Sequence, residues 1–159
     1  MTVESLNTKR VSLADINDTF NRLIKPVEDQ VGDDRWQTPT ESLMLLQGDC
    51  EDYAICKLYA CLEYGYDPKT IKLLAVRLNA VYHGGKQGTT INHMVLSVDG
   101  WCLDNYVKEI VKLTARQDIV SIYGTIEPGV SNNYYQWNAM LKRRVPESDT
   151  AMIRNCLDR

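Results

Sequence analysis

The N-terminal part of the chain spaces its apolar residues as an amphipathic helix does. Ser12 precedes this stretch and Asp15 follows three residues later, which resembles a capping box with Asp in place of the usual Glu. Pro26 stops the pattern. The sequence therefore predicts a first helix whose core-facing stripe is Leu13, Ile16, Phe20, Leu23 and Ile24.

A second, shorter helix is predicted next. Thr38, Pro39 and Glu41 suit the N-cap, N1 and N3 positions of a helix that runs to about Gln47. Gly48 then allows the chain to turn. Two helices should therefore meet close to the residues that follow Gly48.

Those residues begin a third helix. Its first turn holds Asp49, Cys50, Glu51 and Asp52, with Asp49 as a natural N-cap. Apolar residues then recur at helical spacing, at Ile55, Leu58, Tyr59 and Leu62. The pattern places one cysteine among three carboxylates at the start of an amphipathic helix.

Apolar and β-branched runs in the middle of the chain predict strands separated by turn residues. The predicted strands are residues 71–78, 91–98, 101–106, 110–113 and 119–123. Residues 134–145 fit a strand or a helix, and residues 148–157 fit a last amphipathic helix. Together these elements predict a single α+β domain over residues 1–159, with residues 1–10 and 146–159 expected to be mobile.

Composition and charge narrow the class of protein. The 159 residues are 44% hydrophobic and 25% charged, as in an ordinary globular domain. A net charge of −3 gives no electrostatic footprint for nucleic acid, so no nucleic-acid partner is expected. The first residues lack the apolar core of a signal peptide, and no stretch is long enough to span a membrane. The sequence as written predicts a cytoplasmic protein, or a periplasmic one if an export leader was removed.

The five cysteines form an odd set without a CxxC pattern, which predicts free thiols in a reducing compartment. Helical spacing separates Cys56 and Cys61 from Cys50, so we interpret both as core thiols. For Cys50 itself, the ordinary interpretation is a small residue packed at a helix start. The positive pole of the helix instead favours the thiolate, and the backbone N–H of Cys50 would help to hold an oxyanion.

The hairpin predicted from strands 91–98 and 101–106 brings a histidine close to a carboxylate. A two-residue turn at residues 99–100 fixes the register, which puts His93 and Asp104 on one face and Tyr106 opposite His93. Diagonal neighbours of this kind have Cβ atoms roughly 7–8 Å apart or less. The imidazole of His93 should therefore reach the carboxylate of Asp104.

This pair suits a nucleophilic cysteine. Asp104 would fix the tautomer of His93, and the other ring nitrogen would take the proton of Cys50. Taken singly, a satisfied histidine in a half-buried strand and a turn-forming aspartate are the ordinary interpretations. His83, the other histidine, lies in a glycine-rich loop without a comparable carboxylate and is the weaker base.

Three segments together resemble a known family. QGDCEDYAICK at 47–57, NHMVLSVDG at 92–100 and LDN at 103–105 are similar, in order and spacing, to the bacterial transglutaminase-like cysteine proteases of the LapG type, which clip surface adhesins at a small-residue site. The resemblance runs from about Val11 to Ile119. It implies a papain-like, transglutaminase-like α+β fold in which N-terminal helices pack on an antiparallel sheet and the nucleophile starts a helix.

By this resemblance Cys50 is the nucleophile, His93 the general base and acid, and Asp104 the orienting residue, with a protein as the substrate. The expected reaction is peptide cleavage through a thioester. A glutamine deamidase or transglutaminase would use the same three residues, and a binding module without turnover is a third hypothesis. Without an export signal, an origin in a phage or mobile element also fits. The sequence does not indicate an oligomeric state.

The family also binds calcium through acidic residues beside its cysteine. The resemblance transfers this role to Asp49 and Glu51, with Asp52 as a candidate third ligand. Carboxylates crowded near a thiolate would raise its pKa, and a divalent cation would offset their charge. Helix capping by Asp49 and Asp52 explains the same residues without a metal, and from the residues alone the two interpretations are evenly balanced.

Overall fold

The computed structural model describes residues 11–27 and 35–158 of the chain. Its helices are α2 (Leu13–Leu23), α3 (Pro39–Leu45), α4 (Cys50–Glu63), α5 (Tyr135–Arg143) and α6 (Pro146–Leu157). Short 3₁₀ turns lie at Pro68–Thr70, Ala80–His83 and Leu113–Ala115. The stretch that fitted either a strand or a helix is therefore the helix α5.

The predicted side-chain caps start the first two of these helices. Ser12 Oγ accepts a hydrogen bond from the backbone N–H of Asp15 at 3.0 Å at the start of α2. Thr38 and Glu41 form a complete capping box at the start of α3. This helix ends before the predicted position, because Leu46 adopts a left-handed backbone with a φ of 56°.

A five-stranded antiparallel sheet forms the second layer. Its strands are β3 (Ile71–Asn79), β4 (Thr90–Val98), β5 (Trp101–Leu103), β6 (Val111–Lys112) and β7 (Ile119–Ile126). Their order in the sheet is β6-β5-β4-β3-β7. A separate parallel pair, β1 (Lys25–Pro26) and β2 (Gln47–Gly48), joins the end of α2 to the start of α4.

The turn between β4 and β5 has the predicted register. Asp99 and Gly100 have positive φ angles of 50° and 82°, as a two-residue type I′ hairpin turn requires. Val98 pairs with Trp101 across the turn. The second strand is shorter than predicted, because β5 ends at Leu103, one residue before the candidate aspartate.

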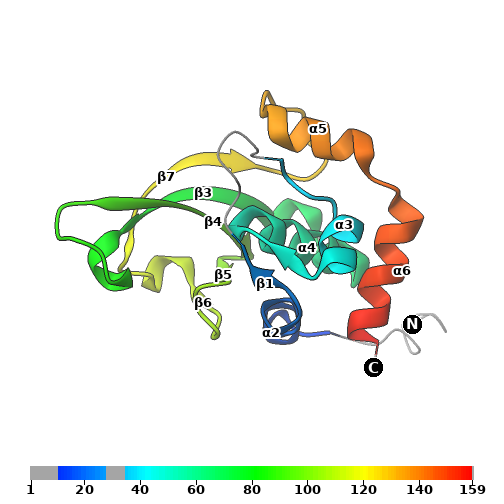
Figure 1. The fold of residues 1–159 in the computed structure, drawn as a ribbon, viewed down its shortest axis with the longest axis horizontal. Coiled ribbons are helices and arrows are strands. Elements are labelled where there is room, and N and C mark those ends of the chain that lie inside the picture. The colour runs from blue at the N-terminus through cyan, green and yellow to red at the C-terminus, as the bar shows by residue number, and fades with distance from the viewer. Residues whose placement is uncertain (1–10, 28–34, 159) are drawn as a thin grey trace.

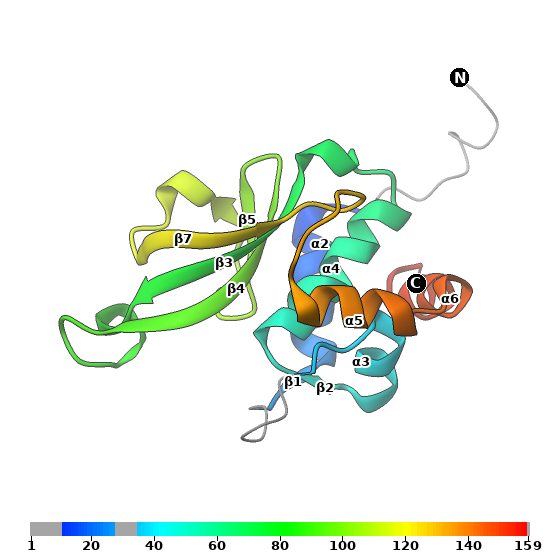
Figure 2. The ribbon, with the colours of Figure 1, turned by 90° about the horizontal axis from the view of Figure 1, so that it is seen from above.

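The helices gather against one end of the sheet, which extends beyond them on the other side (Figures 1 and 2). The helix α4 contacts α2, α3 and α6 as well as β3 and β4, so it lies at the centre of the core. Along β4, Leu96 faces this core and Val95 faces a smaller cluster on the opposite side of the sheet. The α4 residues with no exposed surface are Ile55, Cys56, Leu58, Ala60 and Cys61.

These layers confirm the predicted α+β class, with helices packed on an antiparallel sheet. Cys56 and Cys61 are core thiols, as predicted, and Trp36 also packs into the main core. Within residues 11–27 and 35–158, none of the helices combines the length and the apolar character needed to cross a membrane.

Candidate active site

The start of α4 determines where Cys50 lies, because Cys50 is the first residue of this helix. Asp49 caps the helix, and Asp52 Oδ2 accepts the backbone N–H of Asp49 at 2.9 Å, which closes a capping box. A Cβ on Gly48 would lie 2.7 Å from Asp52 Cβ, so a larger residue there would force a shift. The sequence GDCED therefore holds the thiol at a defined helix start.

The thiol of Cys50 lies between its own helix and the strand β4. It donates to Glu51 Oε2 at 3.3 Å and accepts from the backbone N–H of Met94, the residue after His93. Burial, and then the charges of Glu51 and Asp49, raise the pKa of this thiol. These effects outweigh the helix pole, which alone would favour the thiolate.

The backbone N–H of Cys50 already has an acceptor. It donates to Asp49 Oδ1 at 2.7 Å. The sequence predicted that this N–H would help to hold an oxyanion, and in this structure that donor is engaged by the helix cap.

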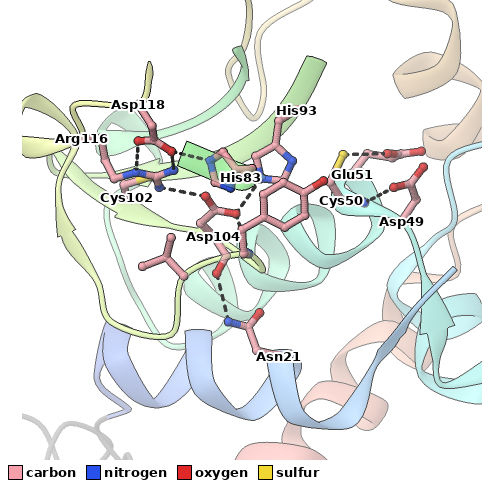
Figure 3. Close-up of polar contacts among 12 residues, drawn as sticks. Asn21, Asp49, Cys50, Glu51, His83, His93, Cys102, Asp104, Arg116 and Asp118 are labelled. Atoms are coloured by element: carbon pink, nitrogen blue, oxygen red, sulfur yellow. Dashed lines mark hydrogen bonds and ion pairs between the residues drawn. The ribbon is translucent and has the colours of Figure 1, made fainter. Parts of the chain in front are cut away.

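His93 and Asp104 form a buried pair close to the thiol (Figure 3). His93 Nε2 and Asp104 Oδ1 are 2.6 Å apart, and the two side chains are 0% and 1% exposed. Among the described residues, His93 Nδ1 is buried and has no hydrogen-bond partner. Because Nε2 is committed to the carboxylate, Nδ1 is the nitrogen left to exchange a proton.

Tyr106 covers the imidazole of His93. The two rings stack with their centroids 3.9 Å apart and their planes 11° from parallel. The backbone N–H of Tyr106 donates to Asp104 Oδ1 at 2.9 Å, so one residue contacts both members of the pair. The predicted register placed Tyr106 opposite His93 on a strand, but Tyr106 lies beyond the end of β5, so this stacking contact is made from the loop that follows the strand.

Ligand-type side chains gather at the same helix start. The ligand atoms of Asp49, Cys50 and Glu51 all lie within 4.8 Å of one another. Asp52 has a different environment, because its Oδ1 accepts the backbone N–H of Gln37 at 2.9 Å and its Oδ2 completes the cap. The structure thus brings two of the three predicted calcium ligands together around the thiol and engages the third in backbone hydrogen bonds.

Comparison with known proteins places this arrangement in a family. A family model described as "Bacterial transglutaminase-like cysteine proteinase BTLCP" matches residues 1–144. The chain belongs to this family. The predicted resemblance is therefore confirmed, and the catalytic class that it supports is a cysteine proteinase.

Solved structures of LapG from Legionella pneumophila resemble this proteinase in fold. The calcium-bound form is 26% identical with a TM-score of 0.64, over 82% of this chain and 77% of LapG. A second LapG structure is 26% identical with a TM-score of 0.65, over 82% and 76%. An EGTA-treated form, at 24% identity and a TM-score of 0.62 over the same shares, matches in fold. A comparison with curated protein sequences gave no match.

Arg116, Asp118 and His83 form a cluster of contacts beside Asp104 that the sequence did not predict. Arg116 Nη1 donates to Asp104 Oδ2 at 2.8 Å, and its Nε and Nη2 donate to the two oxygens of Asp118 at 2.8 Å each. His83 Nε2 lies 2.8 Å from Asp118 Oδ2, so the expectation that His83 lacks a carboxylate is wrong. Arg116 and Asp118 lie between a 3₁₀ turn and β7, where no periodic pattern marks them.

This cluster keeps both carboxylates ionised. Burial favours the protonated carboxyl of Asp104, but hydrogen bonds from His93 and Tyr106 and the charge of Arg116 hold its pKa below the usual range. The hydrogen bonds from Arg116 lower the pKa of Asp118 well below its usual range, against a smaller effect of burial.

A second line of contacts reaches Asp104 from the helical layer. Lys57 Nζ donates to Asn21 Oδ1 at 2.6 Å, and Asn21 Nδ2 donates to the backbone oxygen of Asp104 at 3.0 Å. Lys57 lies on α4 and Asn21 on α2, so both helices help to position the loop that carries Asp104. The sequence pattern predicted neither contact.

Proposed function

We propose that this cysteine proteinase cleaves peptide bonds with Cys50, His93 and Asp104 as a catalytic triad. His93 Nδ1 takes the proton of the thiol, and the sulfur of Cys50 attacks the substrate carbonyl carbon. As the C–N bond breaks, the imidazolium gives this proton to the leaving amine and a thioester remains. The same imidazole then takes a proton from a water molecule as the water oxygen attacks the thioester carbonyl, and it gives that proton to the sulfur as the C–S bond breaks, which releases the carboxylic acid product and restores the thiol.

Asp104 has an orienting role in this scheme. Its carboxylate keeps the proton of neutral His93 on Nε2, so that Nδ1 is free to act as the base. It also stabilises the imidazolium that forms when Nδ1 takes the second proton. The contact of 2.6 Å between two side chains that water does not reach makes both effects strong.

The observation that carries the proposal is that His93 Nδ1 has no hydrogen-bond partner within residues 11–27 and 35–158. A buried polar nitrogen without a partner costs free energy, and a purely structural histidine would be expected to use both ring nitrogens. The neighbouring backbone N–H, that of Met94, contacts the sulfur of Cys50. Membership of a cysteine proteinase family supports the same assignment.

We also propose that calcium binds at the start of α4 through Asp49 and Glu51. Their carboxylates are hard oxygen ligands, and the 4.8 Å limit on their separation suits one ion, whose ligands are at most about 5 Å apart. LapG has been solved in a calcium-bound form. Asp52 would serve as a third ligand only by sharing oxygens that already accept backbone N–H groups. Calcium would supply positive charge that offsets these carboxylates beside the thiol.

Cleavage of a proteome-derived peptide library tests the proposed reaction. The wild-type protein, with calcium, should create new peptide N-termini with a common flanking sequence, and Cys50→Ala should create none. Cys156→Ala is the matched control, because it removes the other partly buried cysteine and should cleave as the wild type does. Equal cleavage by Cys50→Ala and the wild type would refute the triad.

Three further measurements separate the alternatives. Chelation by EGTA should lower both the cleavage rate and the Tm, and no change in either would remove the calcium proposal. Release of ammonia from glutamine-containing peptides without chain cleavage would identify a deamidase. Iodoacetamide should label Cys50 faster than Cys156; equal labelling together with no turnover would identify a binding module.

A further inference from the structure

A single arginine joins two histidine–aspartate pairs in this molecule (Figure 3). His93 contacts Asp104, Arg116 contacts both Asp104 and Asp118, and Asp118 contacts His83. The distances in this row are 2.6 Å for the first contact and 2.8 Å for the others. The proposed mechanism uses only the first pair, so the remaining three residues have no role in it.

The guanidinium of Arg116 is held in one orientation. Its Nε and Nη2 form a two-pronged contact with Asp118, which fixes the plane of the group. The remaining nitrogen, Nη1, is thereby directed at Asp104 and also lies 3.4 Å from the sulfur of Cys102. The side chain of Arg116 is only 6% exposed, so little water competes for these bonds.

Each oxygen of Asp104 then has its own donors. Oδ1 accepts from His93 and from the backbone N–H of Tyr106, and Oδ2 accepts from Arg116. Without the arginine, Oδ2 would be left without its charged donor in a buried position, and the carboxylate would be free to rotate or to take up a proton. Either change would loosen the contact that holds the imidazole of His93.

We propose that Arg116 is a positioning residue for the triad, and that Asp118, supported by His83, sets the direction of its guanidinium. This inference rests on the proposed proteinase function. Arg116 acts through Asp104 and touches neither the substrate nor the sulfur of Cys50. Its effect therefore falls on the turnover rate more than on substrate binding.

A purely structural role makes different predictions. Burying two carboxylates with one guanidinium adds little net stability in many proteins, because desolvation offsets the attraction. If the network only stabilised the fold, loss of Arg116 would reduce the amount of folded protein, and the folded fraction would keep its kcat and the geometry of His93. If Arg116 positions Asp104, the folded protein itself has a lower kcat.

The test compares Arg116→Ala with Arg144→Ala. Arg144 is also largely buried, pairs with Asp149 at 2.8 Å and stacks on Tyr59, and it lies outside the triad. The first readout is the far-downfield proton resonance of the His93 imidazole N–H that bonds Asp104. It should persist in the wild type and in Arg144→Ala and disappear in Arg116→Ala.

The second readout is turnover on a peptide that the wild type cleaves. Arg116→Ala should lower kcat by about 10- to 100-fold with KM nearly unchanged, the size expected for a misplaced catalytic group. Added guanidinium ion should restore much of the kcat of Arg116→Ala by filling the space left by the side chain. It should not change the kcat of Arg144→Ala.

A third variant, Asp118→Asn, keeps Arg116 but weakens the contact that orients its guanidinium. It should reduce the intensity of the His93 N–H resonance and lower kcat, each less than Arg116→Ala does. This variant tests the inference if Arg116→Ala does not fold. A His93 resonance that is unchanged in every folded variant would overturn the inference, whether or not the protein cleaves peptides. A wild-type protein without peptidase activity would instead refute the proposed function.

Discussion

Replacing Lys57 with methionine should change how the stability of the protein depends on pH. Lys57 is 1% exposed, and its amine donates to Asn21 Oδ1. Burial disfavours the charged form and lowers the pKa of Lys57 to about 7 from its ordinary 10.5, although the charge of Asp104 acts in the opposite direction. The folded protein therefore releases this proton at a much lower pH than the unfolded chain does.

The size of the effect follows from that difference in pKa. A difference of one corresponds to about 1.36 kcal/mol, so a fall from 10.5 to about 7 corresponds to about 5 kcal/mol. Between these pH values the unfolded chain still binds a proton that the folded state has lost, so the free energy of unfolding rises with pH. This contribution is complete above pH 10.5 and is lost as the pH falls to about 7. The methionine side chain does not titrate, so Lys57→Met lacks this pH-dependent contribution to the free energy of unfolding.

Urea unfolding at two pH values measures this contribution. From about pH 7 to about pH 9, the wild type should gain about 2–3 kcal/mol of unfolding free energy relative to Lys57→Met. The cysteines, whose thiols ionise in the unfolded chain near this range, are present in both proteins, so their effects largely cancel. Lys69→Met removes an exposed lysine and should follow the wild type. If the wild type and Lys57→Met gain stability in parallel, the buried amine is not the cause.

Four further substitutions test the site. Asp104→Asn should lower kcat by about 10⁴-fold while the circular dichroism spectrum stays the same, because an amide no longer holds the imidazole in the required tautomer; a loss below tenfold would contradict the orienting role. Glu51→Gln should abolish the rise in Tm that calcium causes. Asp52→Asn should lower the free energy of unfolding without calcium by about 1 kcal/mol, because it weakens the helix cap, and should keep the calcium-dependent rise in Tm. Loss of that rise in Asp52→Asn would show that Asp52 is a calcium ligand. Gly48→Ala should cost about 1–3 kcal/mol in thermal unfolding, because its Cβ would lie 2.7 Å from Asp52 Cβ, and an unchanged Tm would show that the helix start yields easily.

Most of the fold could be predicted because short-range signals determine it. The capping box at Thr38 and Glu41 and the two-residue turn at Asp99 and Gly100 each involve residues within three positions of one another. Such contacts form the same structure in many sequence contexts, so the residue types alone identify them. The starts of α2, α3 and α4 and the hairpin register were therefore predicted correctly, whereas α6 begins at Pro146, two residues before the predicted start.

The end of β5 could not be predicted from the residue types. The predicted strand ran to Tyr106, yet β5 stops at Leu103. Asp104 Oδ1 accepts the backbone N–H of Tyr106, and this side-chain bond two residues along the chain replaces a continued ladder. An aspartate that turns the chain and a polar residue in the alternating pattern of a strand look the same in the sequence.

The aspartates of the site show why only part of it could be predicted. The donors of Asp49 are within its own helix start, and those of Asp104 include Tyr106, two residues away. Arg116 is twelve residues from Asp104, and in sequence it is one more cation in an irregular segment. Its importance depends on the fold that brings the loop after β5 and the segment before β7 close enough for Arg116 to contact Asp104. Sequence patterns can therefore identify candidate catalytic residues that have local donors or a predictable strand register, whereas the side chains that contact them from distant loops become visible only in the fold.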